Sequence, residues 1–598
     1  MMASGVGADR RAGPIDNDYP EEIPMSQPNG AEVLLDILNG YAVEAIFSSP
    51  GSEWPPLWEA LARRADAGEP APAYYNARHE DLAIGQAMGY ARATGKLGVC
   101  LVHATVGTLH AAMGIRAAYH EQIPLLVLAG ESVSFGEGAD AWVGAQWGRF
   151  LADHGGPARL VDSICKSSFG LNTPTVLAGA VHRACALAMG APQGPVFLSL
   201  PFEHLHQPAV LPAPARYANP STPRPERAAL EQAAAWLKAA RNPLIIVENA
   251  ARTAGEAARL VQLAERLGAG VVEGQHPGFV NFPREHPLHA GFYAQPYMKD
   301  VDAVLMLEAP GPWYPPTAMT PPGARLIAVA QDPLRGRDPY SGFTADLIIQ
   351  GDAMAAVDVL LERLPSATAG AEQRTAAWGE RSTGRRAQWR EQALQHAGAT
   401  PIDARFLCHE LNACLPDDAV IVDETILTHH TLINVMDRLK PGHFINALSG
   451  GLGLGIGMAL GAAVGLPDAL PVVFVGDGTY NYNPGLAALG FSQQYGVGLL
   501  TVIFNNGHYR SMQMGTEFLY PTGVAVARQH HVSSPIAPNP DYGQLAVMFG
   551  GHGEKVDDPA QIRAAVGRAV AAVREGRPAI LDVRIGDEVA FLAKVFGG

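Results

Sequence analysis

The chain has 598 residues, too many for one hydrophobic core, so we expect two to four domains. Its 48% apolar and 17% charged residues are ordinary for a soluble protein, and the formal net charge of −15 argues against a nucleic-acid partner. Five cysteines without CxxC spacing predict reduced, mostly buried thiols in a cytoplasmic enzyme. Residues 1–27 are polar, and glycines interrupt the apolar stretches before about 18 residues, so neither a secretory signal nor a membrane span is expected.

Strand-like and helix-like patterns alternate in three blocks along the chain. The first contains EAIFSS, LGVCLVH, PLLVLAG and GPVFLSLP, the second NPLIIVENA, DAVLMLEAP, RLIAVAQDP and ADLIIQGD, and the third AVIVDE, PVVFVGDG, LLTVIFNN and AILDVRIG. Short apolar strands between helices are typical of parallel sheets covered on both faces. The sequence therefore predicts an α/β fold of three doubly wound parallel-sheet domains. The predicted segments are a tail (1–27), a first domain (28–205), a Pro-rich linker (206–226), a central domain (227–364), a polar linker (365–400) and a third domain (401–598).

Two strand-length runs of the third block each end at a small polar cluster, Gly476-Asp477-Gly478 and Asn505-Asn506-Gly507. A right-handed crossover brings both strand ends to one edge of the sheet, where open α/β sheets bind their ligands. The Asp477 carboxylate, the Asn506 amide oxygen and the His508 carbonyl are hard oxygens, which suit Mg²⁺ with phosphate and water completing its shell. Each turn alone is common, but the pair predicts a metal–phosphate site.

This pattern, GDG followed about two dozen residues later by NN, resembles the motif of thiamine-diphosphate (ThDP) enzymes. In that family Mg²⁺ bridges the cofactor's diphosphate to the protein. The resemblance implies that Asp477, Asn506 and the His508 carbonyl are the metal ligands. It also implies pyrimidine-binding, Rossmann-like and diphosphate-binding roles for the three domains in chain order. The implied cofactor contacts in the first turn are those of Gly476, Gly478 and Thr479.

Three further segments resemble the same family. NARHEDLAIGQAMGYARATGK matches the helix whose first glutamate hydrogen-bonds N1′ of the cofactor, which implies this role for Glu80. The alternative is a solvated glutamate favoured by the helix dipole. SGGLGLGIG matches a turn whose carbonyl, near Gly450, receives the 4′-amino group, while Leu452 wedges the cofactor into a V shape. DETILTHH is expected to start a helix, and a helix N-terminus is a natural anion site. Its similarity to the family's diphosphate-binding turn implies that Thr428 and His429 bind the diphosphate.

Within the superfamily, the chain most resembles the benzoylformate decarboxylases, and acetolactate synthases somewhat less. FSSPGSEWPPLWEAL is similar to the loop whose serine contacts the substrate carboxylate, which implies this role for Ser52. LVHATVGTLHAAMG is similar to the segment whose histidine relays protons, which implies this role for His103. A histidine at this position favours the decarboxylase branch.

The chain also departs from that decarboxylase pattern. The segment EAPGPWYPPTAM, which carries Trp313-Tyr314-Pro315, lacks the second active-site histidine, and Ile426 stands where a threonine lines the substrate pocket. Late proton delivery must therefore differ. His430 and the pair His530-His531 are candidates.

These features predict a ThDP- and Mg²⁺-dependent enzyme that decarboxylates a 2-oxo acid through C2 ylid attack and an enamine. Alternatives are acetolactate-synthase-like carboligation, C–C bond cleavage or hydrolysis, and an inactive regulatory protein of the same fold. FAD in the central domain is conceivable but not indicated, because VENAARTAG is not a GxGxxG fingerprint. The family's architecture places each cofactor between two subunits, which implies a homo-oligomer, either a dimer or a dimer of dimers. The substrate itself stays open.

Overall fold

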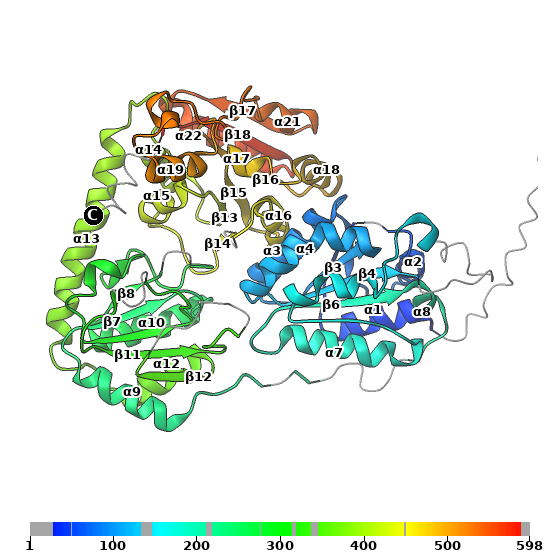
Figure 1. Ribbon diagram of the computed structural model, residues 1–598, viewed down its shortest axis with the longest axis horizontal. Helices are drawn as coiled ribbons and strands as arrows, with labels where there is room; N and C mark the ends of the chain where they lie inside the picture. The colour runs from blue at the N-terminus through cyan, green and yellow to red at the C-terminus, as the bar shows by residue number, and fades with distance from the viewer. Residues whose placement is uncertain are drawn as a thin grey trace, which may run out of the picture.

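The computed structural model describes residues 28–49, 51–132, 146–210, 218–219, 221–274, 277–313, 319–336, 345–447 and 450–587. Three six-stranded sheets form the framework, and all pairings between their strands are parallel (Figure 1). The predicted fold class is confirmed. Among the described helices, none is both long and apolar enough to cross a membrane.

The first sheet has the order β2-β1-β3-β4-β6-β5. Its strands are β1 (Ala45–Ser48), β2 (Ala73–Asn76), β3 (Gly98–His103), β4 (Leu125–Glu131), β5 (Ser167–Gly170) and β6 (Pro195–Pro201). The main helices are α1 (Gly30–Gly40), α2 (Pro55–Ala67), α3 (Glu80–Thr94), α4 (Ala104–His120), α6 (Gly156–Val161), α7 (Leu177–Met189) and α8 (Phe202–His206). The four apolar segments predicted as strands are β1, β3, β4 and β6, the inner strands of this sheet.

The central sheet has the order β12-β11-β10-β7-β8-β9. Its strands are β7 (Pro243–Val247), β8 (Gly270–Val272), β9 (His289–Gly291), β10 (Ala303–Leu307), β11 (Arg325–Ala330) and β12 (Leu347–Gln350). The helices are α9 (Arg227–Ala239), α10 (Ala254–Leu267) and α12 (Ala353–Arg363).

The third sheet has the order β14-β13-β15-β16-β18-β17. Its strands are β13 (Ala419–Glu424), β14 (Phe444–Asn446), β15 (Leu470–Gly476), β16 (Leu499–Asn505), β17 (His552–Val556) and β18 (Pro578–Arg584). The helices are α14 (Ala404–Cys414), α15 (Thr428–Val435), α16 (Gly455–Gly465), α17 (Asp477–Tyr480), α18 (Gly485–Tyr495), α19 (Arg510–Leu519), α20 (Val524–Ala527), α21 (Gly543–Met548) and α22 (Ile562–Arg574). Helix α18 is the predicted crossover between β15 and β16.

Most of the polar segment 365–400 is a helix, α13 (Ala371–Gln395), which runs along one edge of the molecule (Figure 1). Two tryptophans anchor this otherwise polar helix. Trp378 joins the core of the central domain, and Trp389 packs against the core of the third domain. The segment therefore connects the two domains as a helix that packs on both.

Helices α3 and α16 pack closely and join the first and third domains in one hydrophobic core (Figure 1). Glycines allow the close approach: a Cβ on Gly89 would overlap the carbonyl oxygen of Met458, and one on Gly461 would overlap that of Gln86. The glycines that follow residue 450 thus serve helix packing.

We expect Gly89→Ala to lower the thermal midpoint of the protein. Because the added methyl group must push α3 and α16 apart, the expected loss of stability is about 1–3 kcal/mol. The matched control is Gly179→Ala on α7, where a Cβ meets no atom within 4 Å. Removing that glycine from a helix should hold or raise the midpoint. Equal midpoints for the two variants would contradict the packing described here.

Candidate active site

The third sheet brings the two predicted turns together at one edge. Strands β15 and β16 are neighbours, with Gly476 opposite Phe504. Asp477 is 2% exposed, and its carboxylate accepts a hydrogen bond of 3.0 Å from the Gly507 N–H. The side-chain oxygen of Asn506 accepts the His508 N–H at 2.9 Å, so Asn506 and His508 form one tight turn beside Asp477.

A second layer of polar residues supports this edge. Asn539 donates to Asp477 at 3.3 Å and to Asn505 at 2.8 Å, and Asn505 donates to Asp582 at 2.7 Å. Sequence reasoning missed Asn539, because it lies in a Pro-rich loop 34 residues beyond Asn505. Asn505 thus faces the protein interior, which leaves Asn506 as the asparagine of the exposed turn.

The donor set fits a divalent cation. Burial raises the pKa of Asp477 above its ordinary value, and the groups that oppose this shift are backbone N–H groups rather than a cationic side chain. A buried carboxylate compensated only by amides gains most from a bound cation. The oxygens of Asp477, Asn506 and His508 are the hard ligands that Mg²⁺ prefers.

Glu424, at the end of β13, stabilises the Gly-rich turn after residue 450. Its Oε1 accepts the N–H groups of Gly453 and Leu454, both at 2.8 Å, and its Oε2 accepts Asn483 Nδ2 at 2.8 Å. Burial raises the pKa of Glu424 to about 7. Gly450 adopts φ 79°, a left-handed conformation that favours glycine. Leu452, in the same turn, is half-buried.

The predicted diphosphate-binding residues begin α15. Thr428 is buried at the helix start, and His429 is fully buried with its Nδ1 2.7 Å from Asp423 Oδ2. His430 Nδ1 lies 2.7 Å from the Tyr293 hydroxyl of the central domain. Burial raises the pKa of Tyr293, so its hydroxyl stays protonated beside His430.

The other candidates for late proton delivery, His530 and His531, follow α20 in the third domain. His531 Nε2 is 3.8 Å from Glu517 Oε1, and neighbouring His530 is exposed. Trp313 is buried in the core of the central domain, and Tyr314 and Pro315 lie outside the described residues.

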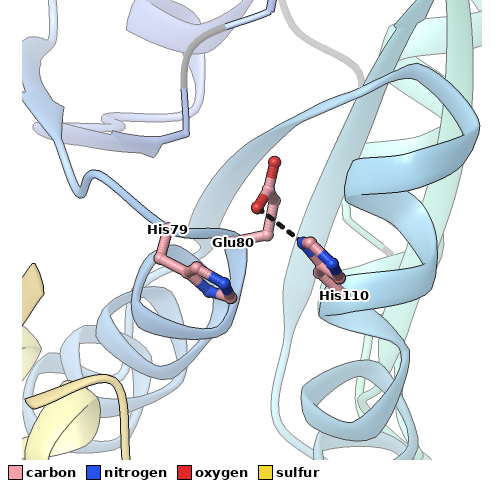
Figure 2. Close-up of side chains that lie close together, drawn as sticks. All are labelled: His79, Glu80 and His110. Carbon is pink, nitrogen blue, oxygen red and sulfur yellow. Dashed lines mark hydrogen bonds and ion pairs between the residues drawn. The ribbon is translucent and has the colours of Figure 1, made fainter.

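At the first sheet's edge, Glu80 is the first residue of α3. Its carboxylate lies 3.2 Å from His110 Nδ1 on α4, and Glu80 is 8% exposed (Figure 2). Gly107 of α4 allows this approach, because a Cβ there would stand 2.9 Å from Glu80 Oε1. The carboxylate at this helix start is therefore buried, not solvated.

His103, at the end of β3, is paired with a buried glutamate that the sequence analysis missed. Its Nδ1 lies 2.8 Å from Glu53 Oε2, and Glu53 Oε1 accepts Gln146 Nε2 at 2.8 Å. The hydrogen bond with Glu53 is the main cause that raises the pKa of His103. Gly51 makes room for the pair, since a Cβ there would lie 2.6 Å from His103 Nδ1. Ser52, beside Glu53, is exposed.

In the central domain, the helix that follows β7 is α10, and its N-terminus is capped by the chain's own side chains. The N-terminus of α10 carries a capping box, in which the Glu256 carboxylate accepts the N–H groups of Arg252 at 3.1 Å and Thr253 at 2.9 Å. The Glu256 carboxylate thus satisfies two backbone N–H groups at this helix start. A cavity of about 490 Å³ lies beside this turn, lined by residues of all three domains.

Three parallel sheets, a buried aspartate beside an Asn-Asn turn, and a buried glutamate at a helix start define a cofactor-dependent enzyme of the thiamine-diphosphate type. Family models agree along the chain: the N-terminal TPP-binding domain of thiamine pyrophosphate enzymes matches residues 28–143, the central domain 230–360 and the C-terminal TPP-binding domain 428–583. The chain belongs to the thiamine pyrophosphate enzymes.

Its relatives include enzymes named for two activities. Acetolactate synthase isozyme 3 large subunit of Escherichia coli is 27% identical, covering 96% of this chain and 98% of that protein. Probable 2-ketoarginine decarboxylase AruI of Pseudomonas aeruginosa is 28% identical, covering 88% and 89%. The solved structure of benzoylformate decarboxylase from Polynucleobacter necessarius has the same fold, with a TM-score of 0.77 at 21% identity, covering 94% of this chain and 99% of that one.

Proposed function

We propose that this enzyme uses ThDP and Mg²⁺ to decarboxylate a 2-oxo acid without oxidation. When bound, ThDP supplies the electron-accepting ring on which such chemistry depends. Asp477, Asn506 and the His508 carbonyl would hold Mg²⁺, while Thr428 and His429 would contact the diphosphate. The remaining contacts would come from the turn residues Gly476, Gly478, Thr479, Gly450 and Leu452.

The residues of the first domain would act on protons and on the substrate. Glu80 would hold a proton at N1′ of the cofactor, and Ser52 would orient the substrate carboxylate. Because Nδ1 of His103 is engaged with Glu53, Nε2 is the ring nitrogen left to exchange a proton with the substrate.

The His103–Glu53 pair is the observation that favours decarboxylation over carboligation. A histidine whose pKa is raised stays protonated at neutral pH more readily, and a proton is what converts the decarboxylated carbon into an aldehyde. Carboligation instead requires a second carbonyl substrate at that carbon. It is the second candidate, supported by the acetolactate synthase relative that matches nearly the whole chain.

The test is incubation of the protein with ThDP, Mg²⁺ and a panel of 2-oxo acids carrying aromatic, aliphatic and guanidinium side chains. We expect CO₂ and aldehyde in equal amounts from at least one of them. CO₂ with a hydroxyketone in place of aldehyde would support carboligation instead. Absence of CO₂ from every acid would overturn the proposal.

We expect Glu53→Gln to shift the alkaline limb of the kcat/KM profile to lower pH. Glutamine fills the same space but removes the negative charge that raises the pKa of His103, so the imidazole loses its proton at lower pH. The control is Glu59→Gln, an exposed glutamate of α2 paired with Arg63. A Glu53→Gln limb that coincides with the control would exclude this role for the pair.

We also propose a dimer or dimer of dimers. Large apolar side chains are exposed near the sheet edges that carry the candidate site in the first and third domains. They are Val106 and Leu109 on α4, and Tyr482 and Leu486 at the start of α18. A second copy would cover them. Light scattering of the purified protein measures the mass directly, and a monomer at micromolar concentration would contradict the proposal.

A further inference from the structure

Two histidines flank Glu80, one on its own helix start and one on α4 (Figure 2). His79, Glu80 and His110 each offer a ligand atom, and these atoms all lie within 4.8 Å of one another. The two imidazole rings are stacked, with centroids 5.0 Å apart and an interplanar angle of 14°. His110 is exposed and His79 half-buried, so both rings can turn toward a ligand held by the Glu80 carboxylate.

Two imidazoles and one carboxylate are a ligand set for Zn²⁺ and similar transition-metal ions, with water in the fourth position. Bonds of about 2.0–2.2 Å in tetrahedral geometry need ligand atoms about 3.3 Å apart. Glu80 Oε2 and His110 Nδ1 already lie 3.2 Å apart, so only His79 must move closer.

The surroundings of His79 allow it to become a ligand. Its Nδ1 now accepts the Asp81 N–H at 3.2 Å, and the Asp81 carboxylate lies 3.6 Å from the same nitrogen. A small rotation would let a protonated Nδ1 donate to that carboxylate, which leaves Nε2 for the metal. Metal-binding histidines commonly donate their second ring nitrogen to a carboxylate in this way.

We propose that His79, Glu80 and His110 form an inhibitory site for a transition-metal ion of the Zn²⁺ class. The site differs from the Asp477 edge in its nitrogen ligands, which Mg²⁺ does not favour. The inhibition, unlike the binding, rests on the proposed function: the ion takes the carboxylate that would otherwise contact the cofactor. Metal binding and productive ThDP binding therefore exclude each other.

The probe is Co²⁺, which is added to full-length protein freed of ThDP and divalent metals. Binding is measured by the visible absorption band of tetrahedral Co²⁺. We expect one equivalent to bind to the wild type. Because loss of an outer partner already weakens metal sites about 10–100-fold, loss of a direct ligand in His110→Asn should weaken binding by at least about 100-fold. Glu80→Gln should behave alike, and ThDP with Mg²⁺ should bleach the band.

Two control variants test whether the Co²⁺ absorption band comes from the His79–Glu80–His110 site. His120→Asn, on the same helix, and Asp477→Asn should both keep the Co²⁺ band. A missing band in the wild type, or an unchanged band in His110→Asn, would overturn the metal site. If Co²⁺ binds as expected but Glu80→Gln retains full turnover, the metal site stands and the proposed catalytic role of Glu80 falls.

Discussion

Glu80→Gln is expected to lower kcat at least about 100-fold while ThDP still binds, since removal of a proton-transferring group typically costs 10²–10⁴-fold. Glutamine occupies the same buried position at the start of α3, but it cannot hold a proton at N1′ as a carboxylate does. The measurement pairs steady-state decarboxylation with cofactor affinity, followed by quenching of tryptophan fluorescence.

The control for this variant is Glu372→Gln, an exposed acidic residue in the first turn of α13. It removes the same charge from the first turn of a helix, so it reproduces the effect on the helix dipole. We expect its kcat to match the wild type. Full turnover in Glu80→Gln would remove the basis of the proposed mechanism, whereas loss of ThDP binding together with kcat would indicate a structural role.

Most inner strands could be predicted from the sequence because they are buried on both faces and read as continuous apolar runs. The inner strand β8, Gly270–Val272, is too short to give that signal. The segment Leu499–Asn505 is buried throughout and begins with a run of apolar residues. The strands not predicted, such as β2, β5 and β17, lie at sheet edges and are partly exposed, so their residues lack that signal. Burial, more than strand propensity, therefore made most of the strands recognisable in the sequence.

The supporting residues of the site could not be predicted, because their partners lie far along the chain. Glu53 meets His103 from 50 residues away, and Glu424 meets Gly453 from 29 residues away. A charged residue between Gly51 and the apolar Trp54 was the only available hint of Glu53. The polar linker predicted at 365–400 is largely the helix α13, which packs on its neighbours through Trp378 and Trp389 and donates hydrogen bonds from Ser382 and Arg385 to the His289 carbonyl.

Asp477→Asn is expected to weaken Mg²⁺-dependent ThDP binding at least about 100-fold, the scale of a lost buried charge–metal contact. Asparagine can still accept the Gly507 N–H, so the turn should persist, but the negative charge that attracts the metal is gone. Calorimetric titration of ThDP at saturating Mg²⁺ measures the change. The control is Asp557→Asn, an exposed aspartate paired with Lys555.

The same carboxylate sets a pH dependence whose sign follows from its burial. Because burial raises the pKa of Asp477, this group becomes protonated at a higher pH than an ordinary aspartate of pKa about 3.9. Protonation removes the metal ligand, so ThDP affinity should fall as pH decreases through the raised pKa, at a higher pH than the one at which exposed aspartates become protonated. In Asp477→Asn this acid-side fall should vanish, because no proton can bind there. If the variant kept both the wild-type affinity and its acid-side fall, the metal would have to be held somewhere other than at the joined ends of β15 and β16.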